Sequence, residues 1–309
     1  MYPGIRDYIS MHFSLFLIGA AVVGMVMPGI DLIPKWLVLP IIASVIFLST
    51  SKIAHEDFLA IQYSRAILFT LLRFIFLPVL MFIAMNKFIP TYSSSIFLLA
   101  LLPAGVMSPV LVHVMGGNIT LALGIVVISS LMAPITLPLA FAFFGNSGVT
   151  LDAMSMFWNL AIVIVFPMFL YGLCARHMSS LTVRIKQNAS CFTVLLMSGC
   201  MLIVVAQRRE VLFQNIPFLV KSLLVMSLAF ASFYVMGWLY PSGKQKRTQI
   251  AYALTSGAMN NMLGISIAFL YFPPEVSLFM VLTEVPWVLS LPLFQYLLER
   301  KYKTSEHSI

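Results

Sequence analysis

Three ionisable side chains lie well inside long apolar stretches of this 309-residue sequence: Arg73, His113 and Glu284. A charge at the centre of a bilayer costs from about 3 to more than about 10 kcal/mol, so such groups usually pair with one another or face a cavity. We therefore expect Arg73 and Glu284 to form an ion pair. Such a pair either opens to accept a substrate carboxylate, carries a proton on Glu284, or is a static bridge.

His113 follows Ser108 by five residues. A titrating imidazole can relay protons between about pH 5 and pH 8, whereas a lone histidine on an apolar helix more often bonds a neighbouring carbonyl. Five helical positions leave the two side chains roughly 140° apart, which is unsuitable for the nucleophile–base pair of an intramembrane hydrolase. The sequence also lacks the Gly-rich Lys-Ser/Thr phosphate loop of an ATP-driven pump. An enzyme is therefore not expected.

The composition indicates a membrane protein, with 61% hydrophobic and 9% charged residues; a soluble domain carries about a quarter charged residues. Apolar runs of about 20 residues are long enough to cross about 30 Å of hydrocarbon. The three cysteines have no metal-like spacing, so neither a metal site nor a cofactor is expected. We predict an all-α membrane protein with ten transmembrane helices, at about 10–29, 36–51, 66–86, 95–115, 119–144, 154–175, 189–206, 222–240, 249–271 and 276–298.

The distribution of lysine and arginine predicts the orientation of the chain. Ten spans place both termini on one side, where twelve Lys and Arg residues gather against five on the other. The positive-inside rule therefore predicts cytoplasmic termini in an inner membrane. The net charge of +8 follows from this bias. Basic residues at the cytoplasmic face interact with anionic lipid headgroups, so the charge does not indicate nucleic-acid binding.

One pattern occurs twice, 152 residues apart: Ala104-Gly105-Val106-Met107-Ser108-Pro109 and Ser256-Gly257-Ala258-Met259-Asn260-Asn261. Each copy combines small, polar and helix-breaking residues in the middle of an apolar run. Matching interruptions in two halves are the best sequence indication of a transporter binding site, because unwound backbone in a membrane needs a cavity or protein beside it. We predict two inverted five-helix repeats, 1–150 and 151–309, whose broken fourth and ninth helices cross.

A longer pattern accompanies these two segments. It consists of Leu102-Pro103-Ala104-Gly105, Gly117-Asn118, Ser129-Ser130, Pro134, Pro138 and Met259-Asn260-Asn261. This pattern resembles the bile acid:sodium symporter family. The resemblance implies a core of spans three to five and eight to ten, a panel of spans one, two, six and seven, and organic-anion transport driven by two sodium ions bound at the crossing.

Several positions depart from the family pattern. Ser108-Pro109 replaces Ser-Asn, Ala122 and Val126 replace two hydroxyl ligands, Ser256 replaces a glutamate, and Arg73 replaces a glutamine ligand. A hard cation needs several oxygen ligands, and a guanidinium beside it would repel it. We therefore expect both sodium sites to be lost, with the Arg73 guanidinium standing in for bound sodium.

The sequence favours a monomeric secondary active transporter that moves a small organic anion, a monocarboxylate or bile-acid-like molecule, by alternating access without the usual two-sodium coupling. A proton is a candidate coupling ion. A sodium-coupled symporter of the family type and a channel-like pore remain alternatives. The candidate substrate- or ion-binding residues are Arg73, Ser108, His113, Asn118, Ser129, Ser256, Asn260, Asn261 and Glu284.

Overall fold

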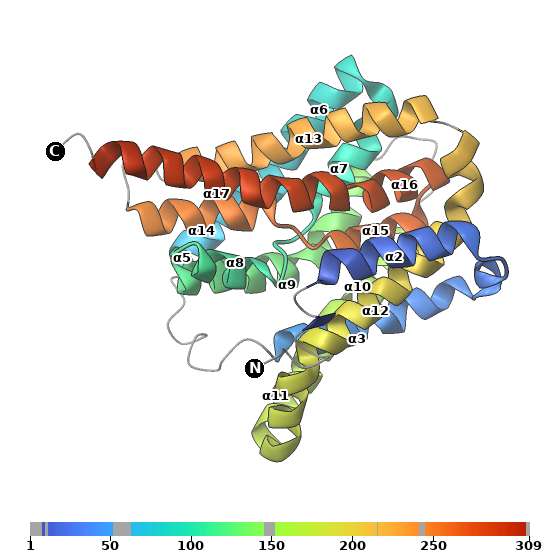
Figure 1. Cartoon of the computed structure of the whole chain (residues 1–309), viewed down its shortest axis with the longest axis horizontal. Coiled ribbons are helices and arrows are strands. Elements are labelled where there is room, and N and C mark those ends of the chain that lie inside the picture. Colours follow the sequence, from blue (N-terminus) through green and yellow to red (C-terminus); the bar gives the residue numbers. More distant parts are fainter. Residues whose placement is uncertain are drawn as a thin grey trace.

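The computed structural model describes residues 8–9, 12–51, 63–144, 152–214, 216–240 and 245–306. These residues form helices and no named strand (Figure 1). The first half contains α2 (Phe13–Val26), α3 (Val38–Thr50), α5 (Tyr63–Leu71), α6 (Leu77–Phe88), α7 (Ser93–Leu101), α8 (Ser108–Val114) and α9 (Ile119–Phe144). The second half contains α10 (Ala153–Leu160), α11 (Phe166–His177), α12 (Ser179–Gln214), α13 (Ile216–Leu239), α14 (Lys246–Gly257), α15 (Asn261–Tyr271), α16 (Pro274–Leu282) and α17 (Glu284–Glu306).

Within the described ranges, six helical stretches are long and apolar enough to cross a membrane. They are Tyr63–Phe88, Ile119–Phe144, Ala153–His177, Ser180–Glu210, Ile216–Leu239 and Pro274–Lys301. Four apolar helices are shorter: Leu15–Val26, Lys35–Thr50, Pro90–Leu101 and Asn261–Tyr271. The expectation of an all-α, multi-pass membrane protein is confirmed, while the division into ten spans and two inverted repeats stays a prediction.

Some helices extend beyond the apolar runs that predicted them. Helix α12 begins at Ser179 and ends at Gln214, well outside 189–206, and α13 begins at Ile216 instead of near 222. Backbone hydrogen bonds continue through polar residues as readily as through apolar ones, so hydropathy underestimates helix length. The predicted tenth span is interrupted at Thr283, between α16 and α17.

Two stretches contain a π-helical turn immediately before a proline. Leu72–Phe76 joins α5 to α6 and precedes Pro78, and Ala161–Val165 joins α10 to α11 and precedes Pro167. Proline has no N–H to donate and its ring clashes with the carbonyl four residues earlier, which favours the wider turn. The first π-helical turn carries Arg73.

Helices from both halves of the chain pack against one another. Helix α12 packs against α2, α3 and α16, and α3 also packs against α11. Helix α13 packs against α14 and α17, while α9 packs against α5, α8, α10 and α14. The interruptions between α7 and α8 and between α14 and α15 lie in the middle of the molecule (Figure 1).

Candidate functional site

The two helix interruptions meet as extended backbone. Ala104 and Met259 form an isolated antiparallel bridge. The Gly105 N–H donates to the Ala258 carbonyl at 2.7 Å, and the Asn260 N–H donates to the Pro103 carbonyl at 2.9 Å. Each interruption therefore satisfies backbone groups that the other leaves free, as a non-helical segment inside a membrane requires.

Two side-chain features permit this close approach. A Cβ atom at Gly105 would lie 2.8 Å from the Met259 carbonyl oxygen, so the second backbone occupies the space that any larger residue would need. The Ser129 hydroxyl of α9 accepts a hydrogen bond from the Ala104 N–H at 3.1 Å. Ser129 thus anchors the first interruption to α9.

Arg73 binds the helix ends that lead into both interruptions. Its Nη1 donates to the Ala100 carbonyl in the last turn of α7 at 2.9 Å. Its Nη2 donates to the Ser256 carbonyl in the last turn of α14 at 2.8 Å and to Met259 Sδ at 3.0 Å. Its Nε donates to Ser256 Oγ at 2.8 Å. A cation at two helix C-termini also complements the negative ends of both helix dipoles.

The Arg73 side chain is completely buried, with 0% exposure. Its guanidinium carbon lies 4.0 Å from the centre of the Phe233 ring and 4.8 Å from that of Phe74, within the range of cation–π attraction. No ion pair between Arg73 and Glu284 occurs in the described part of the chain, where Arg209 pairs with Asp31 at 3.7 Å. The expected Arg73–Glu284 pair is therefore wrong, because backbone carbonyls and a sulfur atom occupy the arginine donors.

A cavity beside the interruptions, which we call the crossing cavity, is bounded by α3, α12, the start of α15 and the start of α17. Four candidates predicted from the sequence line it: Ser108, Asn260, Asn261 and Glu284. The other helices contribute Ser49, Thr193, Met197 and Trp287 to its wall.

Several buried polar atoms around this cavity make no hydrogen bond within the described structure. They are the hydroxyls of Ser108 and Thr193, both amide atoms of Asn261 and the indole Nε1 of Trp287. Ser108 is 0% exposed, Asn261 4% and Thr193 7%. Unsatisfied buried polar groups cost about 1–3 kcal/mol each. Because these residues line one cavity, the cavity is a candidate binding site for a polar ligand.

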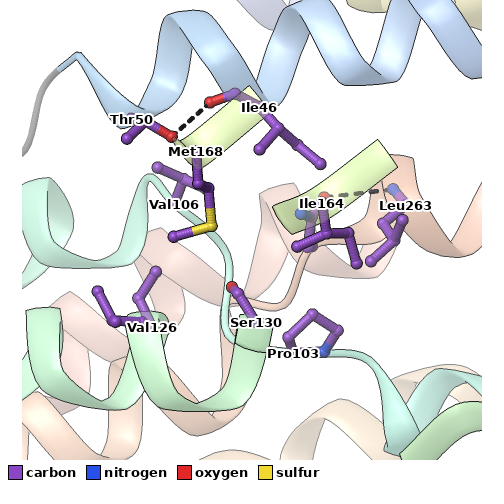
Figure 2. A pocket seen from close by; sticks show the side chains of 11 residues that line it. Ile46, Thr50, Pro103, Val106, Val126, Ser130, Ile164, Met168 and Leu263 are labelled. Atoms are coloured by element: carbon purple, nitrogen blue, oxygen red, sulfur yellow. Dashed lines mark hydrogen bonds between the residues drawn. The ribbon is translucent and has the colours of Figure 1, made fainter. Parts of the chain in front are cut away.

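A second cavity, the α9 cavity, shares Asn260 with the crossing cavity. Figure 2 shows Val126 and Ser130 of α9, Ile46 and Thr50 of α3, and Met168 of α11 around it. Ile46, Val106 and Asn260 line both cavities. Most of the residues that line the α9 cavity are apolar, and the Thr50 hydroxyl already donates to the Ile46 carbonyl at 2.7 Å.

The residues around Arg73 do not fit a sodium cage. The oxygen atoms of Ala100 and Ser256 that could face a cation already accept hydrogen bonds from Arg73. On α9, which supplies none of these partners of Arg73, Ala122 is fully buried and Val126 lines the α9 cavity, and neither side chain has an oxygen atom. A metal ion here would meet a guanidinium and few free oxygen ligands.

The remaining candidates lie elsewhere. The side chain of His113 is exposed on α8 and lines neither cavity. Asn118 is the residue before α9, where its Oδ1 accepts from the Leu121 N–H at 3.1 Å and its N–H donates to the Arg247 carbonyl at 2.9 Å. These contacts give Asn118 a helix-capping role.

The candidate set left out two residues of the cavity wall whose buried polar atoms make no hydrogen bond within the described structure, Thr193 and Trp287. Thr193 is a single hydroxyl on a long helix, and no local pattern distinguishes it from a threonine that bonds its own backbone. Trp287 is one of four tryptophans in the sequence, and no local pattern distinguishes it from a tryptophan that packs in the core.

The sequence matches the model of the Sodium Bile acid symporter family over residues 32–215, more than half of the chain. It is 25% identical over 219 residues to the uncharacterized protein YbaS of Bacillus subtilis (strain 168), covering 68% of this chain and 70% of that protein. It is 22% identical over 282 residues to the uncharacterized sodium-dependent transporter YocS of the same organism, covering 87% of this chain and 85% of that protein. The resemblance found in the sequence is thereby confirmed.

Proposed function

Because the chain belongs to the sodium bile acid symporter family, we propose that it is a secondary active transporter that moves a small organic anion by alternating access without the two-sodium coupling. The family membership supports the transporter class. The contacts of Arg73 support the proposal that transport is not coupled to two sodium ions.

The observation that carries the proposal is the position of the Arg73 guanidinium, which donates to carbonyls at the ends of α7 and α14. A sodium ion at such a place would collect the same kind of oxygen atoms. A covalently attached cation provides the positive charge permanently and takes part in no ion cycle. Energy for uphill transport then has to come from another gradient, for which the proton is our candidate.

The crossing cavity is the proposed substrate site. The unpaired donors of Ser108, Thr193, Asn261 and Trp287 suit a small solute with several acceptor oxygens. Helix α15 begins at Asn261 on the same cavity, where the positive end of its dipole favours negative charge. A monocarboxylate meets both requirements.

Alternating access needs two bodies that move against each other around this cavity. We propose a core of α5–α9 and α13–α17 and a panel of α2, α3, α10, α11 and α12, each built from both inverted repeats, 1–150 and 151–309. The cavity wall draws residues from both groups, with Ser49 and Thr193 from the panel and Asn261 and Glu284 from the core. Rocking of the panel against the core would expose the cavity to each side of the membrane in turn.

Purified protein in proteoliposomes tests the function directly. Thermal unfolding is first measured with pyruvate, lactate, pantothenate and a sulfate ester, each in sodium and in choline buffer. The anion that stabilises the protein is then used, radiolabelled, in counterflow. We expect stabilisation and counterflow that are equal in both buffers, and counterflow also separates a carrier from a pore.

A sodium-coupled symporter is the second candidate. It is favoured by the similarity over 87% of the chain to YocS, whose name describes a sodium-dependent transporter. Stabilisation or uptake that requires sodium would select this candidate and overturn the sodium-independent one.

A further inference from the structure

Glu284 is the one side chain with an ionisable carboxyl or amine among those that line the crossing cavity in the described part of the chain. It is the first residue of α17 and follows the turn at Thr283 that interrupts the tenth apolar run. It lines the cavity together with Asn261, whose two amide atoms make no hydrogen bond within the described structure. Glu284 thus lines a largely apolar cavity whose other described lining residues carry no carboxyl or amine group.

The charged groups on the surrounding helices do not neutralise Glu284. Arg73 does not line the cavity but contacts Met259, which does. Its N–H groups donate to the Ala100 and Ser256 carbonyls and to the Met259 sulfur. From α13, Tyr234 interacts with Ser290 on α17 and presents a neutral phenol. His12 precedes α2, whose Phe13 ring lies 5.9 Å from the Trp287 ring, and His12 itself contacts the Tyr8 ring.

We propose that Glu284 is the proton-binding residue of this transporter and that its protonation is required for anion binding in the crossing cavity; this inference rests on the proposed function. An ionised Glu284 places a negative charge in the same small cavity as the anion, and the two repel each other in a medium of low dielectric constant. A protonated Glu284 carries no charge and supplies an O–H donor to the anion. One proton and one monovalent anion then cross together without net charge.

A structural alternative exists, because an acidic residue in the first turn of a helix stabilises that helix through its dipole. In that role Glu284 would stay ionised over the whole physiological range, and its replacement would lower stability without changing any dependence on pH. The test therefore has to detect the proton itself.

The tryptophan at position 287 provides a reporter that needs no substrate. The chain has four tryptophans, and Trp287 lines the cavity together with Glu284. With Trp36, Trp158 and Trp238 replaced by phenylalanine, the emission of Trp287 is followed from about pH 5 to about pH 9. We expect one sigmoidal transition, because the indole responds to the charge beside it, and we expect Glu284→Gln to abolish it.

The matched control is Glu275→Gln, which removes an exposed carboxylate at the start of α16 and should leave the transition intact. Asn261→Ala removes a polar amide from the same cavity wall and should displace the midpoint, which gives a second test if Glu284→Gln does not fold. A flat titration, or one that Glu284→Gln leaves unchanged, overturns the inference.

Transport supplies the second measurement, with radiolabelled pyruvate as the probe, or radiolabelled pantothenate if pyruvate gives no counterflow. An inward gradient of one pH unit should concentrate the anion up to about tenfold, since one pH unit is worth about 1.4 kcal/mol per proton. Glu284→Gln should retain counterflow and lose this accumulation.

The two proposals can fail separately. Counterflow without accumulation in a pH gradient would refute the proposal that Glu284 couples transport to protons, and the proposed transporter function would still stand. No exchange of any tested anion would remove the proposed function, while the Trp287 titration would still decide whether Glu284 binds a proton in the cavity.

Discussion

Arg73 is the residue around which the two halves of the molecule meet. Its guanidinium has five N–H groups in a planar fork, so one side chain can reach the carbonyls of Ala100 and Ser256, the Ser256 hydroxyl and the Met259 sulfur. A lysine has a single flexible ammonium group and cannot span these partners in the same way.

Replacing Arg73 tests its role in stability. Arg73→Gln leaves the Ala100 and Ser256 carbonyls without their donor, and we expect the free energy of unfolding to fall by about 2–5 kcal/mol, since each unsatisfied buried group costs about 1–3 kcal/mol. Arg73→Lys should be intermediate. Thermal unfolding in detergent measures the effect.

Lys87→Gln is the matched control, because Lys87 is an exposed cation at the end of α6. A wild-type melting temperature for Arg73→Gln, or normal anion exchange by that variant, would contradict the assignment of Arg73 as the resident cation.

At the scale of elements, two features of the broken helices matter. The interruptions satisfy each other's backbone groups, and the π-helical turn before Pro78 carries the residue that joins them. Local sequence explains both kinds of irregularity, because glycine and proline act on the backbone at their own positions.

Gly105 tests whether the interruptions must touch. A Cβ atom there would lie 2.8 Å from the Met259 carbonyl oxygen and 3.0 Å from that of Ala258, so Gly105→Ala has to push two backbones apart. We expect a loss of about 1–3 kcal/mol of stability, the usual cost of overpacking. Thermal unfolding and counterflow both report it.

Gly172→Ala is the comparison, since a Cβ atom at Gly172 on α11 meets nothing within 4 Å. Alanine is also the better helix former by about 1 kcal/mol, so this variant should be at least as stable as the wild type. Equal effects of the two substitutions would mean that the contact between the interruptions is dispensable.

At the scale of the whole molecule, the position of the termini remains to be measured. Twelve Lys and Arg residues on the side of the termini against five on the other predict that both ends are cytoplasmic. A green fluorescent protein fused after Ile309 should therefore fluoresce in a bacterial host, whereas alkaline phosphatase fused at the same place should be inactive. The opposite pair of results would reverse the topology.

Composition and hydropathy were sufficient to predict a helical, multi-pass membrane protein, and the repeated motif located both helix interruptions to within a few residues. The same motif supplied Ser108, Asn260 and Asn261, which line the crossing cavity. These features are local: a helix forms and ends according to residues within one or two turns of each position.

The partners of the buried charges were decided by the tertiary structure. Arg73 and its partner Ser256 are 183 positions apart in the sequence. The predicted pair of Arg73 and Glu284 was wrong because Arg73 binds backbone carbonyls, which every residue has and which no residue type identifies. His113 illustrates the same limit, since it faces outward although its helix borders the cavity. Which groups surround a side chain depends on how distant helices pack, and in this protein that packing separates a sequestered cation from a carboxyl group in the cavity.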